Sequence, residues 1–179
     1  NSIKLPSAIT KQQDAQNTVR LRPLLENEIA RKLVSVEDFQ DRSTVTILGD
    51  GLFESGSAQI QDQYYPVLAA VSQALDSVEG QIIVTGYTDN QPIQSLNFPS
   101  NWHLSQARAD AVKEILLNYV KNGGTRIRSE GRGSTDPVAP NDTLENRAKN
   151  RRVEITLFTT GTGPKLGSTV EIKNNTSNP

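Results

Sequence analysis

The residues best placed to do chemistry are two opposite charges, Asp89 and Arg108, on either side of one loop. Asp89 follows the near-continuous apolar stretch 81–87, which predicts a buried strand. Arg108 lies in the early turns of a long amphipathic helix predicted over 102–122. A strand end that faces a helix start forms a notch. An acid and a base lining one notch suit a ligand that carries both a carboxylate and an amine, since the arginine fork holds a carboxylate with two hydrogen bonds.

Each of these charges also has an ordinary structural interpretation. An aspartate after a strand is most often a turn former that accepts hydrogen bonds from nearby backbone N–H groups. Arg108 could be a solvated helix charge, or it could form a structural ion pair with Asp89. Such a pair is compatible with a ligand site, because a ligand carboxylate could compete for Arg108 while a ligand amine meets Asp89.

A second cluster of charges lies around the start of the last predicted strand. It consists of Arg147, Lys149, Arg151 and Arg152. All but Arg151 are expected to be solvated or to pair with Glu145 and Glu154. By strand alternation, Arg152 shares the face opposite the core with Glu154. Arg151 therefore points to the other side, close to the notch.

Catalysis finds little support in the residues. Asp50, Glu54 and Asp89 could supply two carboxylates for glycoside hydrolysis, but nothing fixes a pair at a suitable separation, and none lies in an evidently apolar pocket that would raise its pKa. His103 and Ser105 are two residues apart on a helix, so they point to diverging faces and form no nucleophile–base pair. We expect a protein that is not an enzyme.

The composition is that of an ordinary globular domain. The chain has 179 residues, 35% of them hydrophobic and 22% charged, with a formal net charge of −1. There is no basic excess to indicate nucleic acid, and the apolar runs are too short to span a membrane. The absence of cysteine and the single histidine exclude disulfides and His/Cys metal clusters, so we expect no metal and no cofactor. The glycine-rich stretch 49–57 lacks the Gly-Lys-Ser/Thr ending of a phosphate-binding loop.

Hydrophobic periodicity predicts an α+β two-layer sandwich, with helices on one face of a mixed sheet. The expected elements are a helix over 21–33, a hairpin of strands 34–40 and 43–48, a helix over 58–78 with Ser57 as its cap and Pro66 kinking it or starting its regular part, a strand over 81–87, a helix over 102–122 that Ser100 or Asn101 caps and Gly123-Gly124 ends, a strand over 126–131, a short helix over 143–150 capped by Thr143, and a strand over 151–158. The polar segments 1–19 and 160–179 are expected to be a flexible lead-in and a flexible tail.

Several motifs, in the right order, resemble the C-terminal peptidoglycan-binding domain of the OmpA, Pal and MotB family. They are Phe53 with Ser-Gly-Ser-Ala at 55–58, Thr-Gly-Tyr-Thr-Asp at 85–89, Asn-Trp-His-Leu-Ser-Gln-Ala-Arg-Ala at 101–109, Gly-Arg-Gly with Pro137 at 131–137, and Asn-Arg-Arg-Val-Glu-Ile at 150–155. The resemblance covers roughly 45–158. The loop between Asp89 and Asn101 looks like the MotB branch. The Arg22-Pro-Leu-Leu and Asp50-Gly-Leu-Phe-Glu-Ser-Gly-Ser-Ala motifs look like type VI secretion anchoring proteins of the TagL or extended TssL kind.

The resemblance implies a four-stranded OmpA-like sheet over 43–159, with residues 20–42 adding an N-terminal helix and a hairpin strand. It also implies noncovalent binding of the peptide stem of peptidoglycan through meso-diaminopimelate. Carried over by position, Asp89 meets the ammonium of the ligand and Arg108 its carboxylate. The remaining expected site residues are Thr88, Asn101 and Arg151, with backbone donors from Ser55 and Gly56. The chain departs from the family at Tyr87, where histidine is usual, and at Glu54, where aspartate is more common.

The expected function is therefore to anchor a membrane-embedded envelope complex, a type VI secretion system, to the cell wall. The expected location is the periplasm, with a tether to the inner membrane in a segment absent from this chain, which lacks methionine and any signal peptide. Expected partners are peptidoglycan and inner-membrane subunits of a secretion complex, with no nucleic acid and a possible homodimer. The alternative is a structural interaction or oligomerisation module of a secretion or motor complex, with a vestigial pocket.

Overall fold

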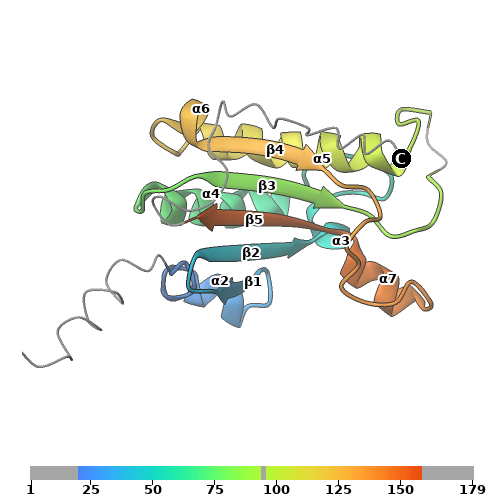
Figure 1. Cartoon of the computed structure of the whole chain (residues 1–179), viewed down its shortest axis with the longest axis horizontal. Helices are drawn as coiled ribbons and strands as arrows, with labels where there is room; N and C mark the ends of the chain where they lie inside the picture. The colour runs from blue at the N-terminus through green and yellow to red at the C-terminus, as the bar shows by residue number, and fades with distance from the viewer. Residues whose placement is uncertain (1–19, 94–95, 159–179) are drawn as a thin grey trace, which may run out of the picture.

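Five strands form one mixed sheet in the order β1-β2-β5-β3-β4 in a computed structural model that describes residues 20–93 and 96–158 (Figure 1). The strands are β1 (Ser35–Asp38), β2 (Arg42–Leu48), β3 (Ile82–Tyr87), β4 (Ile127–Gly131) and β5 (Arg152–Phe158). The helices are η1 (Arg22–Leu24), α2 (Glu26–Ala30), α3 (Gly49–Leu52), η2 (Asp62–Tyr64), α4 (Tyr65–Asp76), α5 (Asn101–Leu117), α6 (Gly123–Arg126) and α7 (Leu144–Asn150). The predicted lead-in and tail lie outside the described residues.

The sheet pairing is antiparallel except at one edge. β5 lies between β2 and β3 and is antiparallel to both, whereas β3 and β4 are parallel. The predicted hairpin of β1 and β2 is confirmed, with Ser35 opposite Thr46 and Asp38 opposite Ser43. The α+β fold class predicted from the sequence is confirmed.

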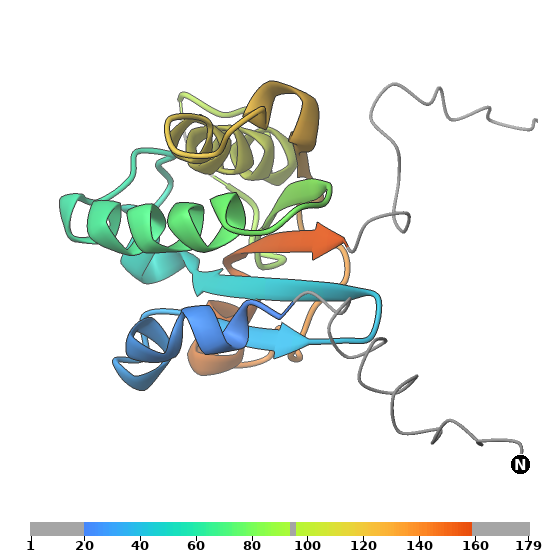
Figure 2. The ribbon, with the colours of Figure 1, turned by 90° about the vertical axis from the view of Figure 1, so that its left-hand side faces the viewer.

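The main helices α4 and α5 cover one face of the sheet and lie behind it in Figure 1, on one side of it in Figure 2. The alternating apolar residues of the central strands point toward these helices. The core includes Val45 and Ile47 of β2, Val153, Ile155 and Leu157 of β5, Leu68, Val71 and Leu75 of α4, and Val112 and Leu116 of α5. The opposite face is polar: the half-buried Thr44 and Thr156 are cross-strand partners whose hydroxyl oxygens lie 3.2 Å apart.

Two predicted helices begin or continue differently in the structure. The predicted helix over 21–33 is split into η1 and α2, because Leu25 leaves the helical region at φ −125° and ψ 24°. The predicted helix over 58–78 starts only at Tyr65, with Pro66 in its first turn, where its missing N–H is harmless. Ser57 is not its cap: its hydroxyl oxygen accepts a hydrogen bond from the Gln59 N–H instead.

The ends of the other predicted helices are mostly as expected. Ser100 caps α5, since its side chain accepts a hydrogen bond from the His103 N–H, and Thr143 caps α7 in the same way. The C-terminal end of α5 was predicted too late: the helix was expected to reach residue 122 but stops at Leu117. The chain then turns at Asn122, which has φ 56°.

Helix α5 lies unusually close to β3 and β4, because glycines face it. A Cβ atom on Gly86 would lie 2.1 Å from the carbonyl oxygen of Ser105, and one on Gly131 would lie 2.3 Å from the backbone nitrogen of Gln106. Any larger residue at either position would push the helix away from the sheet. The early turns of α5, including Arg108, are thereby held against the ends of these strands.

The described chain begins and ends at the same end of the sheet. Arg42 pairs with Phe158, the last described residue, and the Leu21 N–H donates to Asp38 at the neighbouring hairpin turn. At the other end of the sheet lie the junction of β2 with α3, the end of β3 and the start of α5, at the right of Figure 1.

Candidate functional site: a charged cleft at the end of the sheet

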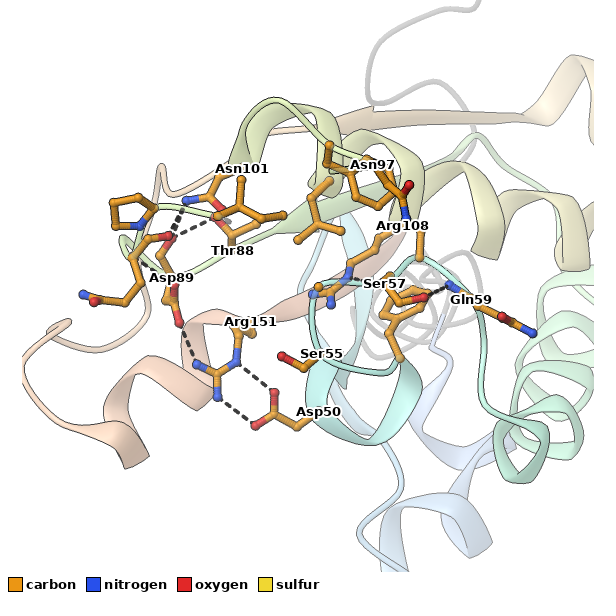
Figure 3. A pocket seen from close by; sticks show the side chains of 18 residues that line it. Asp50, Ser55, Ser57, Gln59, Thr88, Asp89, Asn97, Asn101, Arg108 and Arg151 are labelled. Carbon is orange, nitrogen blue, oxygen red and sulfur yellow. Dashed lines mark hydrogen bonds and ion pairs between the residues drawn. The ribbon is translucent and has the colours of Figure 1, made fainter. Parts of the chain in front are cut away.

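A cleft of about 1190 Å³ opens where β3 ends and α5 begins (Figure 3). All seven predicted site residues line it: Ser55, Gly56, Thr88, Asp89, Asn101, Arg108 and Arg151. Asp50, Phe53, Leu104 and the loop residues Gln91, Pro92 and Ile93 complete much of its wall. The prediction that Asp89 and Arg108 share one notch is therefore confirmed as geometry; their contact with a ligand stays a prediction.

Asp89 is only 8% exposed and is fixed by its own turn. Its Oδ1 accepts a hydrogen bond of 3.0 Å from the Gln91 N–H, so the structural interpretation as a turn former is also correct. The Asn101 side-chain amide donates to the carbonyl oxygens of Gln91 at 2.8 Å and of Asp89 at 3.5 Å. The Thr88 hydroxyl donates to the same Asp89 carbonyl at 2.8 Å. These bonds hold the Asp89 carboxylate just after the C-terminal end of β3.

Arg151 joins two carboxylates. Its Nη1 donates to Asp89 Oδ2 at 2.6 Å, while its Nε and Nη2 donate to the two oxygens of Asp50, both at 2.8 Å (Figure 3). Hydrogen bonding from Arg151 lowers the pKa of Asp50, and the bond to Asp50 is the main reason that the pKa of Arg151 is raised. Asp50 and Arg151 are therefore charged at neutral pH, and one guanidinium is shared between two carboxyl groups.

Arg108 has a different environment. Its Nε donates to the Ser57 carbonyl at 2.8 Å, its Nη2 donates to the Glu54 carbonyl at 3.3 Å, and its guanidinium lies over the ring of Phe53 at 4.9 Å from the centroid. Burial lowers its pKa to about 10, so it remains charged at neutral pH. In the described part of the chain no carboxylate forms an ion pair with Arg108. Neither structural interpretation of Arg108 holds: the residue is 5% exposed rather than solvated, and Arg151 rather than Arg108 pairs with Asp89.

The cleft thus contains an unmatched negative charge near Asp89 and a positive charge at Arg108. A group that carries an ammonium and a carboxylate complements this arrangement, because each charge then meets a partner in a partly desolvated site. Among the described residues no group of three His, Cys, Asp or Glu side chains is arranged to hold a metal ion.

Two neighbours of the site were not recognised from the sequence. Asp50 was considered only as a possible hydrolytic carboxylate; its position directly after β2, at the same sheet end as Asp89, was the signal that could have shown its role. Asn150 precedes Arg151 and is fully buried: its Oδ1 accepts from the Val138 and Ala139 N–H groups, and its Nδ2 donates to the Ala139 carbonyl, so it ties the loop before α7 to the start of β5.

Arg152 was predicted to be solvated or paired with Glu154, and only the pairing is correct. Its Nε lies 3.2 Å from Glu154 Oε1, but the residue is 4% exposed. The guanidinium lies 3.9 Å from the centroid of the Tyr87 ring and donates to the carbonyls of Asn150 and Asp136. Burial raises the pKa of the stacked Tyr87 to about 12. Arg152 therefore does not line the cleft; it packs beside Tyr87 on the sheet face opposite the core.

The chain belongs to the OmpA family, whose family model matches residues 52–151. Its fold is similar to that of the cell wall anchor of the T6SS from Pseudomonas aeruginosa, at 49% sequence identity and a TM-score of 0.74, over 79% of this chain and 99% of that one. It is also similar to Motility protein B of Bacillus subtilis, 36% identical over 76% of this chain and 51% of that protein. The Peptidoglycan-binding protein ArfA of Mycobacterium bovis is 35% identical over 67% of this chain and 36% of that protein. The chain thus spans about half the length of the motility protein and about a third of ArfA.

Proposed function

We propose that this domain binds peptidoglycan noncovalently, by clasping the free end of meso-diaminopimelate in the peptide stem. The observation that carries the proposal is the opposite charge of the two sides of the cleft: Asp89 and Arg108 line one cavity without pairing to each other. The free end of a stem diaminopimelate bears one ammonium and one carboxylate. Asp89 accepts the ammonium, and Arg108 holds the carboxylate.

The other site residues act on the same ligand end. Thr88 and Asn101 fix the backbone of Asp89. Arg151 adds a second guanidinium to the cleft, beside the carboxylate of Asp89. Ser55 and Gly56 lie on the wall formed after α3, where their backbone N–H groups add donors for a carboxylate. Gly56 has φ 67°, a conformation that favours glycine.

The role that we propose for binding is anchoring rather than catalysis. The lowered pKa of Asp50 removes it as a proton donor at neutral pH, and Asp89 accepts hydrogen bonds from Arg151 and from the Gln91 N–H. The relatives that support this role carry names that describe a cell wall anchor and a peptidoglycan-binding protein.

We propose that the anchored machine is a type VI secretion system, and that the domain works in the periplasm, tethered to the inner membrane and to subunits of the secretion complex. The similarity to the T6SS anchor supports this choice over a flagellar motor, because its identity of 49% exceeds the 36% to Motility protein B. Within the described residues, no helix is both long and apolar enough to cross a bilayer.

The test is sedimentation with isolated sacculi. The parent domain is expected to sediment with sacculi, while Asp89→Asn and Arg108→Met are expected to lose at least tenfold in affinity. The matched control for Asp89→Asn is Glu114→Gln, which removes the same charge at an exposed position of α5. If the parent fails to sediment, the function is wrong and the interaction-module alternative is favoured. If both site variants sediment as well as the parent, peptidoglycan is bound elsewhere.

A further inference from the structure

Asp50 is the residue of the cleft whose arrangement is not explained by ligand contact. It lies in α3, immediately after β2, and its side chain is 58% exposed, whereas that of Asp89 is 12% exposed. It nevertheless holds Arg151 by two parallel hydrogen bonds of 2.8 Å, the bidentate geometry that restricts a guanidinium most strongly. Asp89 makes one bond to the same guanidinium.

The backbone keeps these two side chains in place. The Gly49 N–H donates to the Arg151 carbonyl at 2.7 Å, so the residue before Asp50 is joined to the backbone of its partner. A Cβ atom on Gly49 would lie 3.1 Å from that carbonyl oxygen, which shows how closely α3 approaches the start of β5. The bidentate pair is therefore formed before any ligand arrives.

The consequence is electrostatic. If Arg151 had Asp89 as its only carboxylate, the two charges would cancel, and an incoming ammonium would meet a neutral pair. With Asp50 bound as well, one guanidinium is shared between two carboxylates. An excess negative charge then remains at the cleft, beside the nearly buried Asp89, and it attracts an ammonium.

We infer that Asp50 is a positioning residue that engages Arg151 and so keeps Asp89 available for the ammonium of the ligand. The inference rests on the proposed function and adds a determinant of its selectivity: Asp50 sets the preference for a ligand end with an amine over one that carries a carboxylate alone. The pKa of Asp50, lowered by its bond to Arg151, is consistent with this role because it keeps the carboxylate charged.

The test compares two synthetic stem peptides. One contains meso-diaminopimelate, and the other contains the analogue in which the free amine is replaced by hydrogen. The ratio of their dissociation constants, measured by isothermal titration calorimetry, reports the ammonium interaction alone. The parent is expected to prefer the amine-bearing peptide by at least tenfold. Asp50→Asn and Asp50→Ser are both expected to reduce this preference to about threefold or less, because Arg151 then neutralises Asp89.

Two controls separate this role from a structural one. Asp50→Glu keeps the charge and is expected to restore most of the preference, and Glu114→Gln removes a distant charge and is expected to leave the ratio unchanged. A loss of packing alone would weaken both peptides equally and leave the ratio at the parent value.

The outcomes are distinguishable. If either neutral variant at position 50 binds with the parent's preference, the inference is wrong while the proposed function stands. If the parent binds neither peptide, or binds both equally well, the proposed ligand is wrong and the inference falls with it.

Discussion

Replacing Arg108 with methionine should separate the stability of the fold from the affinity of the cleft. Burial lowers the pKa of Arg108 to about 10, well below the ordinary value of arginine. At about 1.36 kcal/mol per pH unit, the buried charge costs the folded state about 3 kcal/mol. Methionine removes this cost and keeps an unbranched apolar stem against Phe53.

The interactions that methionine removes are of similar size. Arg108 donates two hydrogen bonds, to the carbonyls of Ser57 and Glu54, and lies over the Phe53 ring. At about 1–1.5 kcal/mol for each bond and about 1 kcal/mol for the ring contact, they contribute about 3–4 kcal/mol. Because the two sums nearly cancel, the free energy of unfolding should change by about 1 kcal/mol or less.

Affinity for a stem peptide should fall much further. A charge-assisted hydrogen-bonded contact to a carboxylate is worth about 3 kcal/mol, which corresponds to a loss of about 100-fold. Stability is measured by urea unfolding followed through the single tryptophan, Trp102, and affinity by calorimetry with the diaminopimelate peptide. Below pH 10 Arg108 is protonated in both the folded and the unfolded state. The cost of its burial is therefore fully present at neutral pH and disappears only as the pH rises through about 10 towards the ordinary pKa of arginine. The difference between parent and variant should thus be constant from pH 6 to 9.

The control is Arg128→Met, at a half-buried arginine of β4 outside the cleft, which should leave affinity unchanged. The reasoning is refuted if Arg108→Met binds the peptide within a factor of two of the parent. It is also refuted if the variant unfolds more easily by about 3 kcal/mol or more, since Arg108 would then be a structural residue.

Three further predictions concern residues that support the site, namely Asn150, Gly86 and Asp50. Asn150→Ala should lower the free energy of unfolding by about 3 kcal/mol, because buried backbone groups lose their partners. The control is Asn146→Ala, which removes only an exposed side-chain bond to Asp142 and should change the free energy by less than about 0.5 kcal/mol. Chemical denaturation measures both. Gly86→Ala should destabilise by about 3 kcal/mol or more, because its Cβ would meet backbone, whereas Gly124→Ala, with open space around it, should be near neutral in thermal unfolding. The lowered folded-state pKa of Asp50 means that its pairing stabilises the fold above pH 3.8 and that this contribution is lost as the pH falls through the folded-state pKa. Acid titration of Asp50→Asn should therefore show a shallower loss of stability below pH 3.8 than the parent, and equal slopes would contradict the pairing.

Periodicity predicted β2 and β5 well because buried and half-buried residues alternate along them, whereas β3 was predicted from an apolar run that is buried at every residue. It failed where tertiary contacts override local pattern. Residues 58–61 continue the apolar spacing of α4, but Ile60 forms a β-bridge with Phe53 on an extended segment. The α-helix therefore begins only at Tyr65. Leu21 and Leu25 have helical spacing and are both fully buried, yet they lie just outside the short helix η1, and the backbone leaves the helical region at Leu25 before α2 begins.

The residues that line the candidate site could be predicted from the sequence, but the ion pairs among them could not. Strand ends and helix starts at one edge of a sheet brought Asp89, Arg108 and Arg151 together as expected. Which cation pairs with Asp89 depends on a difference of a few ångströms that spacing along the chain does not encode. The bidentate partner Asp50 joins residues 101 positions apart, so only the fold reveals it.

The cleft lies at the opposite end of the sheet from the first and last described residues, which lie near Asp38 and at Phe158. With the proposed wall contact in the cleft, a load between the wall and this other end of the domain would act along the strands. The hydrogen bonds between β2 and β5 would then be loaded in shear, many at a time, rather than breaking one after another. Mechanical resistance would thus follow from where the two attachments sit, before any single contact is strengthened.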